Sequence, residues 1–338
     1  MLFKNPVSQD ALAAPPDEGA AKMGPLFGRS LAMRRVITAI ERLAPSSASV
    51  VITGESGTGK ELVARTIHEL SPRRAAPYVP INCAAIPESL MESELFGHER
   101  GSFTGADRRH PGCFEAANGG TLLLDELTEM KPQAKLLRVI EEGRVRRVGG
   151  VTEIPIDVRV LAASNRDIEP AVHNGLLRAD LYYRLSVFSI HLPPLRERLE
   201  DIPQLVQMFI EQYAVQNHKE VIGADEECVK ALQANPWPGN VRQLRNVIER
   251  AVIICEGRTI SPNDLPDPFR VAKTSTASYI KMPLGSSLEA VEKEMILRTI
   301  EFSRGNKTRA AATLGVSVKT LYNKLDQYEL GCTNASAA

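Results

Sequence analysis

The sequence has no closely spaced cysteines and no apolar run long enough to cross a membrane. Its five cysteines are Cys83, Cys113, Cys228, Cys255 and Cys332. Because none of them belongs to a CxxC pair, the sequence argues against a zinc site and a disulfide framework and suits a reducing compartment. The N-terminus also lacks the apolar core of a signal peptide. We therefore expect a cytoplasmic protein with no membrane partner.

The sequence also has no excess of charge that would suggest a partner. Lys plus Arg and Asp plus Glu each number 41, so the formal net charge is zero. Any surface for nucleic acid must therefore be local. A length of 338 residues with 43% apolar residues is typical of a globular protein with about two domains or more.

A glycine-rich stretch in the first part of the chain joins a predicted strand to a predicted helix. Residues 50–53 are apolar or β-branched, and residues 61–69 carry apolar side chains at helical spacing. The turn between them consists of Gly54, Glu55, Ser56, Gly57, Thr58, Gly59 and Lys60. This order indicates a phosphate-binding loop, in which backbone N–H groups, the helix N-terminus and the lysine contact phosphate oxygens. Glu61 stands where a magnesium-binding Ser or Thr is expected, and a plain turn with a surface lysine is the alternative.

A second predicted strand ends in two adjacent carboxylates. Residues 119–124 read GGTLLL and lead directly into Asp125 and Glu126. A buried strand of an open α/β sheet delivers such residues to its carboxyl edge, where ligands bind. There Asp125 can hold a magnesium ion and Glu126 can polarise an attacking water. With a phosphate loop upstream, we interpret the pair as catalytic rather than as an exposed strand end.

Several other polar residues allow both a structural and a functional interpretation. Asn165 follows the predicted strand 158–163 and can either bond a terminal phosphate or form a turn. Arg178 and Arg184 have apolar neighbours and by themselves indicate a surface pair. Arg242 lies in the first turn of a predicted helix, where its partner can be a bound anion or solvent.

The segment 101–106 reads GSFTGA, with one large aromatic among small residues. One interpretation is a loop whose Phe103 packs into the core. The other is a mobile hairpin tip that presents Phe103 and Thr104 to a partner, since glycines at both ends supply hinges. The residue types alone favour the core position.

The last part of the chain indicates a basic helical domain. Two short helices are predicted over 308–314 and 318–328, joined by the turn 315–317, which is helix-turn-helix spacing. On the second helix we expect an inward face made of Val318, Leu321, Tyr322 and Leu325. Residues 302–325 contain five basic residues and no acidic one, so the neutral total hides a local cationic patch. A helical oligomerisation module is the alternative.

Taken together, these pieces resemble the bacterial enhancer-binding activators of the sigma-54 RNA polymerase, a branch of the AAA+ ATPases. The likeness covers residues 26 to about 330, nearly everything but the first two dozen residues. The phosphate loop of the family reads GESGTGKE, as residues 54–61 do, so a glutamate at position 61 is usual in this family. Residues 101–106 correspond to the family's GAFTGA loop, with Ser102 in place of Ala. That loop contacts sigma-54, and it is the most discriminating motif.

The resemblance also assigns roles to single residues. Asn82 falls where the family has a switch asparagine that holds the catalytic glutamate, and Asn165 falls at the first sensor. Residues 177–185 read LRADLYYRL and match a family segment that makes Arg178 and Arg184 candidate arginine fingers for a neighbouring subunit. Residues 237–244 read WPGNVRQL, which places Arg242 at the family's second sensor.

The remaining assignments concern nucleotide, polymerase and DNA. The nucleotide site includes residues 54–61 together with Phe27 and Gly28. The sigma-54 contact comprises Gly101, Ser102, Phe103, Thr104, Gly105 and Ala106. The Fis-type helices would bind DNA through Thr308, Arg309, Ser317, Lys319, Thr320, Asn323 and Lys324.

The expected fold is an α/β AAA+ core with a parallel sheet and a helical lid, followed by a small all-α helix-turn-helix domain. The segments are a flexible tail (1–24), the α/β ATPase subdomain (25–195), the lid without strands (196–268), a linker (269–285), the Fis-type domain (286–331) and a short tail (332–338). Relatives often carry an N-terminal receiver domain, which we do not find in this sequence. Regulation by a separate protein, by expression level or constitutive activity therefore remain open.

The resemblance implies an ATP- and magnesium-dependent transcription activator. It would assemble as a ring, a hexamer by family likeness, with dimeric DNA-binding units on an upstream double-stranded site. Its partner would be the sigma-54 RNA polymerase holoenzyme, whose closed complex it would convert to an open one. A general AAA+ remodelling ATPase is one alternative. A DNA-binding repressor with a vestigial ATPase core is the other.

Overall fold

The computed structural model describes residues 7–8, 21–23, 26–270, 287–303 and 306–333, in two compact units over 1–271 and 272–338. The strands are β1 (Val7–Ser8), β2 (Ala21–Met23), β3 (Leu26–Gly28), β4 (Val50–Thr53), β5 (Tyr78–Asn82), β6 (Thr121–Asp125), β7 (Arg144–Arg146), β8 (Glu153–Pro155), β9 (Arg159–Ser164), β10 (Phe188–His191), β11 (Gly223–Ala224) and β12 (Thr259–Ile260). The helices of the first unit are α2 (Leu31–Leu43), α3 (Lys60–Glu69), α4 (Glu88–Phe96), α5 (Cys113–Ala116), α6 (Gln133–Glu142), α7 (Ile168–His173), α8 (Ala179–Leu185), α9 (Ile202–Gln216), α10 (Glu226–Gln233) and α11 (Asn240–Ile254). Those of the second are α12 (Leu288–Phe302), α13 (Lys307–Leu314) and α14 (Val318–Thr333).

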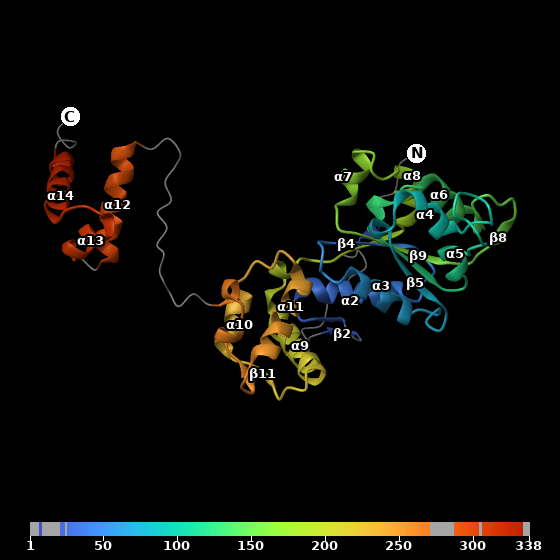
Figure 1. The fold of residues 1–338 in the computed structure, drawn as a ribbon, viewed down its shortest axis with the longest axis horizontal. Helices are drawn as coiled ribbons and strands as arrows, with labels where there is room; N and C mark the ends of the chain where they lie inside the picture. The colour runs from blue at the N-terminus through green and yellow to red at the C-terminus, as the bar shows by residue number, and fades with distance from the viewer. Residues whose placement is uncertain (1–6, 9–20, 24–25, 271–286, 304–305, 334–338) are drawn as a thin grey trace. The chain divides into compact units, whose positions relative to one another are not determined.

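A parallel sheet forms the centre of the first unit (Figure 1). Its strands lie in the order β1-β10-β4-β9-β6-β5, and every neighbouring pair is parallel. β4 leads into the glycine-rich loop and lies between β10 and β9, whereas β5, the next of these strands along the chain, lies at the far edge. This crossover leaves the carboxyl ends of β4, β9 and β6 side by side, which is where such sheets bind ligands.

Helices cover both faces of this sheet. Along β6, Leu122 and Leu124 belong to one core with α4, α6 and α8, whereas Leu123 belongs to the other core with α2 and α3. Strands buried on both faces explain the nearly continuous apolar sequence of β4, β6 and β9. The polar residues that follow these strands therefore gather at one edge of the sheet. The expected α/β class is confirmed.

The lid is a helical layer built around one tryptophan. α9, α10 and α11 enclose Trp237, which is fully buried, donates from Nε1 to the Leu232 carbonyl (2.8 Å) and stacks on Phe269. The expectation that this region has no strand is wrong, because β11 and β12 form a short parallel pair. Each of these strands has two residues, too few to produce a period-two pattern in the sequence.

Two short strands lie within residues 1–24, where we expected a tail. β2 pairs antiparallel with β3, and β1 adds to the edge of the main sheet beside β10. Backbone hydrogen bonds to neighbouring strands form these two strands, so their side chains need not alternate between apolar and polar as in a predictable strand. The rest of 1–24 lies outside the described residues.

The second unit is a three-helix arrangement with a small core of Ile296, Ala310, Ala311 and Leu321. The inward face expected on α14 is only partly correct. Leu321 is buried and Leu325 partly so, but Val318 and Tyr322 are 37% and 46% exposed. A unit of three short helices buries only a narrow part of each helix surface, so the side chains on either side of Leu321 remain partly exposed.

Candidate nucleotide-binding site

The glycine-rich loop connects β4 to α3 and holds the ammonium group of Lys60. Lys60 is only 7% exposed, and its Nζ donates to the carbonyls of Gly54 (2.8 Å) and Glu55 (3.2 Å). Burial lowers the pKa of Lys60, and the nearby charges of Glu126 and Asp125 oppose that shift. A buried cation at a helix N-terminus is arranged to bind an anion.

The lid packs directly against this loop. Gly57 has a φ of 80°, and a Cβ at this position would overlap the carbonyl oxygen of Gly239 in the lid. Arg242, in the first turn of α11, donates from its backbone N–H to the Gly57 carbonyl (3.3 Å) and from Nη1 to Ser56 Oγ (3.0 Å). The loop therefore has the lid as a fixed neighbour.

Glu55 faces the beginning of the lid. Its carboxylate accepts two hydrogen bonds from Arg196 (2.9 and 2.7 Å) and one from Asn240 Nδ2 (3.1 Å). The hydrogen bond from Arg196, with a smaller contribution from Asn240, lowers the pKa of Glu55 to about 2. Glu55 was predicted to bind the cofactor, but its side chain does not line the cavity described below.

The two carboxylates predicted to be catalytic lie at the end of β6. Glu126 has a φ of 55°, a strained conformation for a residue with a side chain, and its N–H donates to Asp125 Oδ1 (3.0 Å). The backbone N–H of Asn165, at the end of β9, donates to Glu126 Oε2 (3.4 Å). Burial, and then the charge of Asp125, raise the pKa of Glu126. A half-buried carboxylate with a raised pKa is suited to accept a proton.

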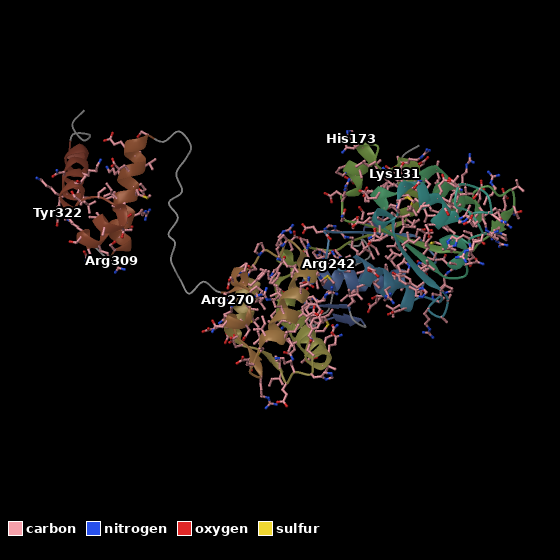
Figure 2. All side chains as sticks on the ribbon, in the orientation of Figure 1. Lys131, His173, Arg242, Arg270, Arg309 and Tyr322 are labelled. Carbon is pink, nitrogen blue, oxygen red and sulfur yellow. The ribbon has the colours of Figure 1, made fainter. Side chains whose placement is uncertain are left out.

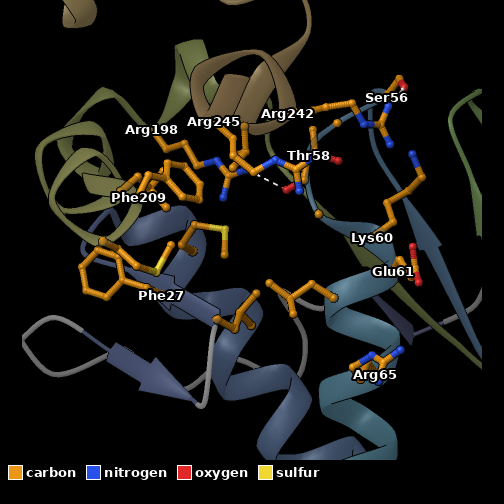
Figure 3. A pocket seen from close by; sticks show the side chains of 18 of the residues that line it. Phe27, Ser56, Thr58, Lys60, Glu61, Arg65, Arg198, Phe209, Arg242 and Arg245 are labelled. Carbon is orange, nitrogen blue, oxygen red and sulfur yellow. Dashed lines mark hydrogen bonds between the residues drawn. The ribbon is translucent and has the colours of Figure 1, made fainter. Parts of the chain in front are cut away.

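These groups line a cavity of about 400 Å³ between the α/β core and the lid, a size within the range of small-molecule sites. In Figure 3, Phe27 and Phe209 close one end, whereas Ser56, Lys60 and Glu61 lie at the other. Its basic lining residues are Lys60, Arg65, Arg198, Arg242 and Arg245, and its acidic ones are Glu61, Asp125 and Glu126. A cavity with aromatic rings at one end and Lys60 at the other fits a base linked to phosphates.

Some predicted site residues lie outside this cavity. Gly28 packs against Met33, whose side chain a Cβ at position 28 would overlap. Asn82 pairs with Asp125 across β5 and β6, and its side chain accepts from the Ala84 N–H (2.9 Å). The cavity lining also does not include Gly54 or the side chain of Asn165.

The two candidate arginine fingers also lie away from this chain's own cavity. Arg178 precedes α8 and is exposed, with an ion pair to Asp180 (2.7 Å). Arg184, also exposed, lines a different cavity with residues 47–49 and Asp157, near the amino ends of β4 and β9. Neither arginine can act on nucleotide in its own subunit from these positions.

Sequence reasoning missed Arg65, Arg198 and Arg245 as cavity residues. Arg65 lies four residues after Glu61 on α3, and Arg245 lies three residues after Arg242 on α11, so helical spacing could have indicated both. Arg198 had no comparable signal, because its burial depends on packing between distant segments.

The GSFTGA segment lies at the surface. Phe103 is 38% exposed and contacts the His98 ring edge-on, with centroids 5.0 Å apart, so its expected core position is wrong. Thr104 is exposed, whereas Ser102 Oγ is buried with no hydrogen-bond partner and lies against Gly149.

The base of this segment is joined to the β7–β8 hairpin. Buried Arg147 pairs with Glu99 (2.7 Å), just before the segment, and with Glu115 on α5. β7 and β8 pair antiparallel in this hairpin. The ion pair therefore links the base of the segment to the hairpin.

Six of the seven predicted DNA-binding residues are exposed, and Lys324 is half-buried. The exposed ones are Thr308, Arg309, Ser317, Lys319, Thr320 and Asn323. Figure 2 shows Arg309 and Tyr322 at the surface of the second unit, and Lys307 Nζ lies 4.7 Å from the Tyr322 ring centroid.

Ser317 and Lys324 have partners within this unit. Ser317 Oγ accepts from the Thr320 N–H at the start of α14 (3.0 Å). Lys324 is half-buried and forms an ion pair with Glu292 (2.6 Å).

The described residues lack two further kinds of feature. No described helix is long and apolar enough to cross a membrane. In the same part of the chain, no group of three or more His, Cys, Asp or Glu side chains is placed to hold a metal ion by itself.

The chain is similar to known regulators over most of its length. Three family models match it: a sigma-54 interaction domain at 26–191, an AAA+ ATPase lid domain at 196–280 and a bacterial regulatory protein of the Fis family at 287–328. Regulatory protein AtoC of Escherichia coli is 46% identical over 312 residues, covering 90% of this chain and 68% of that protein. Transcriptional regulatory protein ZraR of Escherichia coli is 48% identical over 322 residues, covering 93% and 71%. The crystal structure of NtrX from Brucella abortus in complex with ATP matches with a TM-score of 0.66 and 38% identity, covering 90% of this chain and 69% of that one.

Proposed function

Because this chain belongs to the family of sigma-54-dependent transcriptional activators, we propose that it uses ATP hydrolysis to convert the closed complex of sigma-54 RNA polymerase into an open one. The core is an AAA+ ATPase domain, followed by a Fis-type helix-turn-helix. The observation that carries the proposal is the combination of a nucleotide-sized cavity with an exposed Phe103-Thr104 tip on the same unit.

ATP would bind in the cavity between the core and the lid. Lys60 would bind the outer phosphates, and Phe27 and Phe209 would enclose the base. Glu126 would accept a proton from the attacking water, a role that its raised pKa supports. Its backbone partner Asn165 would hold the carboxylate in place.

Asp125 fits the role of magnesium ligand. It lines the same cavity as Lys60, and within the described residues its carboxylate accepts one hydrogen bond, at Oδ1. Magnesium at nucleotide sites uses one or two carboxylates together with phosphate oxygens, so a cluster of protein ligands is unnecessary. When bound, the ion would neutralise charge on the phosphates.

Catalysis would need a second subunit. Arg178 and Arg184 are exposed and lie outside their own cavity, which supports a role toward the nucleotide of a neighbour. An arginine supplied in this way stabilises the charge of the transition state. We propose a ring of subunits, a hexamer by family likeness, with ATP at each interface.

The nucleotide state would reach the polymerase through residues 101–106. The Arg147–Glu99 pair supports this route, because it joins the base of the segment to the hairpin of the core. The exposed residues of α13 and α14 would hold the ring on an upstream DNA site in the cytoplasm, as dimeric units on two half-sites.

Open-complex formation tests this function. Sigma-54 holoenzyme on a promoter melted at its start site should form heparin-resistant complexes only when the full chain and ATP are both present. Thr104→Ala should keep the wild-type ATPase rate and lose activation, because Thr104 is exposed and remote from the cavity. Normal activation by this variant would refute the loop assignment. ATP hydrolysis without activation by the wild type would favour a general remodelling ATPase, and no hydrolysis would favour a repressor.

A further inference from the structure

Arg198, near the beginning of the lid, is a buried cation inside the nucleotide-sized cavity. It is 4% exposed and lines the same cavity as Lys60 and Glu126. Figure 3 shows its guanidinium between Thr58 and Phe209, midway between the polar and apolar ends of the cavity. Arg198 is therefore near the place where phosphates would join the rest of a nucleotide.

The hydrogen bonding of this guanidinium is incomplete. Nη2 donates to the Thr58 carbonyl (2.9 Å), whereas Nε is buried without a partner. Arg198 forms no ion pair with any acid in the described part of the chain. Asp201, three residues later, is already bound by the N–H groups of Arg29 (2.6 Å) and Ser30 (2.8 Å) and by the Ser30 hydroxyl (2.8 Å).

A second buried arginine shows what complete hydrogen bonding looks like in this protein. Arg159 is 2% exposed and donates from Nε, Nη1 and Nη2 to the carbonyls of Ala48 (3.2 Å), Ala44 (2.9 Å) and Leu43 (2.9 Å). These carbonyls include the last ones of α2, so Arg159 has a structural role at a helix C-terminus. It does not line the nucleotide cavity.

Burial lowers the pKa of Arg198 to about 10, and the charge of Asp201 opposes that shift. No carboxylate of the described residues bonds to this guanidinium, so an anion of a ligand would complete its contacts. We propose that Arg198 binds an anionic phosphate oxygen of the nucleotide while Nη2 remains on the Thr58 carbonyl. The nucleotide would then connect the loop to the lid through one guanidinium. This inference rests on the nucleotide site of the proposed function and is independent of sigma-54.

ADP and AMP titrations of the full-length protein by calorimetry would test the proposal without turnover. Arg198→Gln keeps a donor for Thr58 but removes the charge, and Arg198→Lys keeps the charge. We expect Arg198→Gln to raise the ADP Kd about ten- to hundredfold, the usual effect of losing a hydrogen bond between charged groups. Arg198→Lys should recover most of the affinity. A loss for both ADP and AMP would assign the contact to the α-phosphate, and a loss for ADP alone to the β-phosphate.

Arg159→Gln is the matched control, because it removes a buried arginine outside the cavity. Its ADP Kd should equal that of the wild type, even if its melting temperature falls. The proposal fails if Arg198→Gln binds ADP as the wild type does, or if Arg198→Lys binds as weakly as Arg198→Gln. If Arg198→Gln does not fold, Arg198→Met, which keeps a long side chain without the charge, is compared with Arg159→Gln, because a phosphate contact predicts weakened ADP binding in the first only. Wild-type protein that does not bind ADP would overturn the nucleotide site itself.

Discussion

The carboxylate of Glu55 accepts hydrogen bonds from both terminal nitrogens of Arg196 (2.9 and 2.7 Å). This pair joins the phosphate loop to the beginning of the lid. Asn240, at the start of α11, donates to the same carboxylate and to the Ser56 carbonyl (3.0 Å). The loop is therefore held from two points of the lid before any nucleotide arrives. A change in lid position would therefore move the loop that binds the phosphates.

Replacement of Glu55 by Gln should weaken this connection. Because Glu55 and Arg196 are both more than a third exposed, we expect little loss of stability. The KM for ATP should rise, since the lid would hold the loop less firmly. Steady-state ATPase kinetics check this, with Glu153→Gln as a control that removes another exposed ion pair, to Arg144 (3.3 Å), away from the cavity. Equal KM values for Glu55→Gln and wild type would contradict the anchoring role.

The same pair predicts a pH dependence. The folded state lowers the pKa of Glu55 from 4.5 to about 2, so its stabilising contribution is complete above pH 4.5. The contribution is lost as the pH falls from 4.5 towards 2, where the folded form also takes up the proton. The difference in unfolding free energy between wild type and Glu55→Gln should therefore be constant at neutral pH and shrink in acid. Urea titrations at a series of pH values measure it, and a difference that grows in acid would be inconsistent with the ion pair.

Glu126→Gln should keep nucleotide binding and lose hydrolysis. Removal of a general base commonly lowers kcat by about 10²- to 10⁴-fold. ADP affinity should change little, because the substitution preserves the size of the side chain. Burial and Asp125 raise the pKa of Glu126, so wild-type kcat should begin to fall, as the pH is lowered, at a higher pH than an ordinary carboxylate would give. Glu129→Gln, whose exposed carboxylate pairs with Arg166 (3.0 Å), is the control, and equal kcat values for both variants would exclude Glu126 as the base.

Ser102→Ala should hold the GSFTGA segment more firmly in place. The Ser102 hydroxyl is buried without a partner, and an unsatisfied buried hydroxyl costs about 1–3 kcal/mol. Water can hydrate this group only when the segment moves away, so serine favours release compared with alanine. Hydrogen exchange of residues 101–106 should be slower in Ser102→Ala, with an unchanged basal ATPase rate. Faster exchange in the variant would show that the hydroxyl stabilises the observed position.

Lys319→Ala and Lys324→Ala should differ in their effect on DNA binding. Lys319 is exposed, so its loss should weaken binding and reduce the slope of log K against log salt by about 1. Lys324 is paired with Glu292, so its loss should change the salt slope less. Binding titrations at several salt concentrations separate the two, and equal slopes would contradict this distinction.

The α/β core was predictable because local pattern and tertiary packing agree there. The strand over Val50–Thr53 and the helix that follows the glycine-rich loop were expected, since their apolar residues match the cores they bury. Asp125 and Glu126 were expected at the carboxyl edge of the sheet because strand direction fixes the side on which such residues emerge.

The failures have physical causes of their own. Arg198 follows a Pro-Pro turn and resembles a solvated residue in the sequence, because its burial requires the lid to fold onto the loop. Phe103 was expected in the core from its type alone, yet its short segment places it against His98 at the surface. Tyr322 has the spacing of an inward residue, but a three-helix unit is too small to cover it.

The close approach of Gly57 to the carbonyl oxygen of Gly239 bears on how substitution data for this position are interpreted. Any larger residue at position 57 would disturb the lid as well as the phosphate loop. A deep mutational scan selecting only for folded protein should already reject changes at this glycine. Intolerance there would thus not by itself demonstrate that the nucleotide is needed.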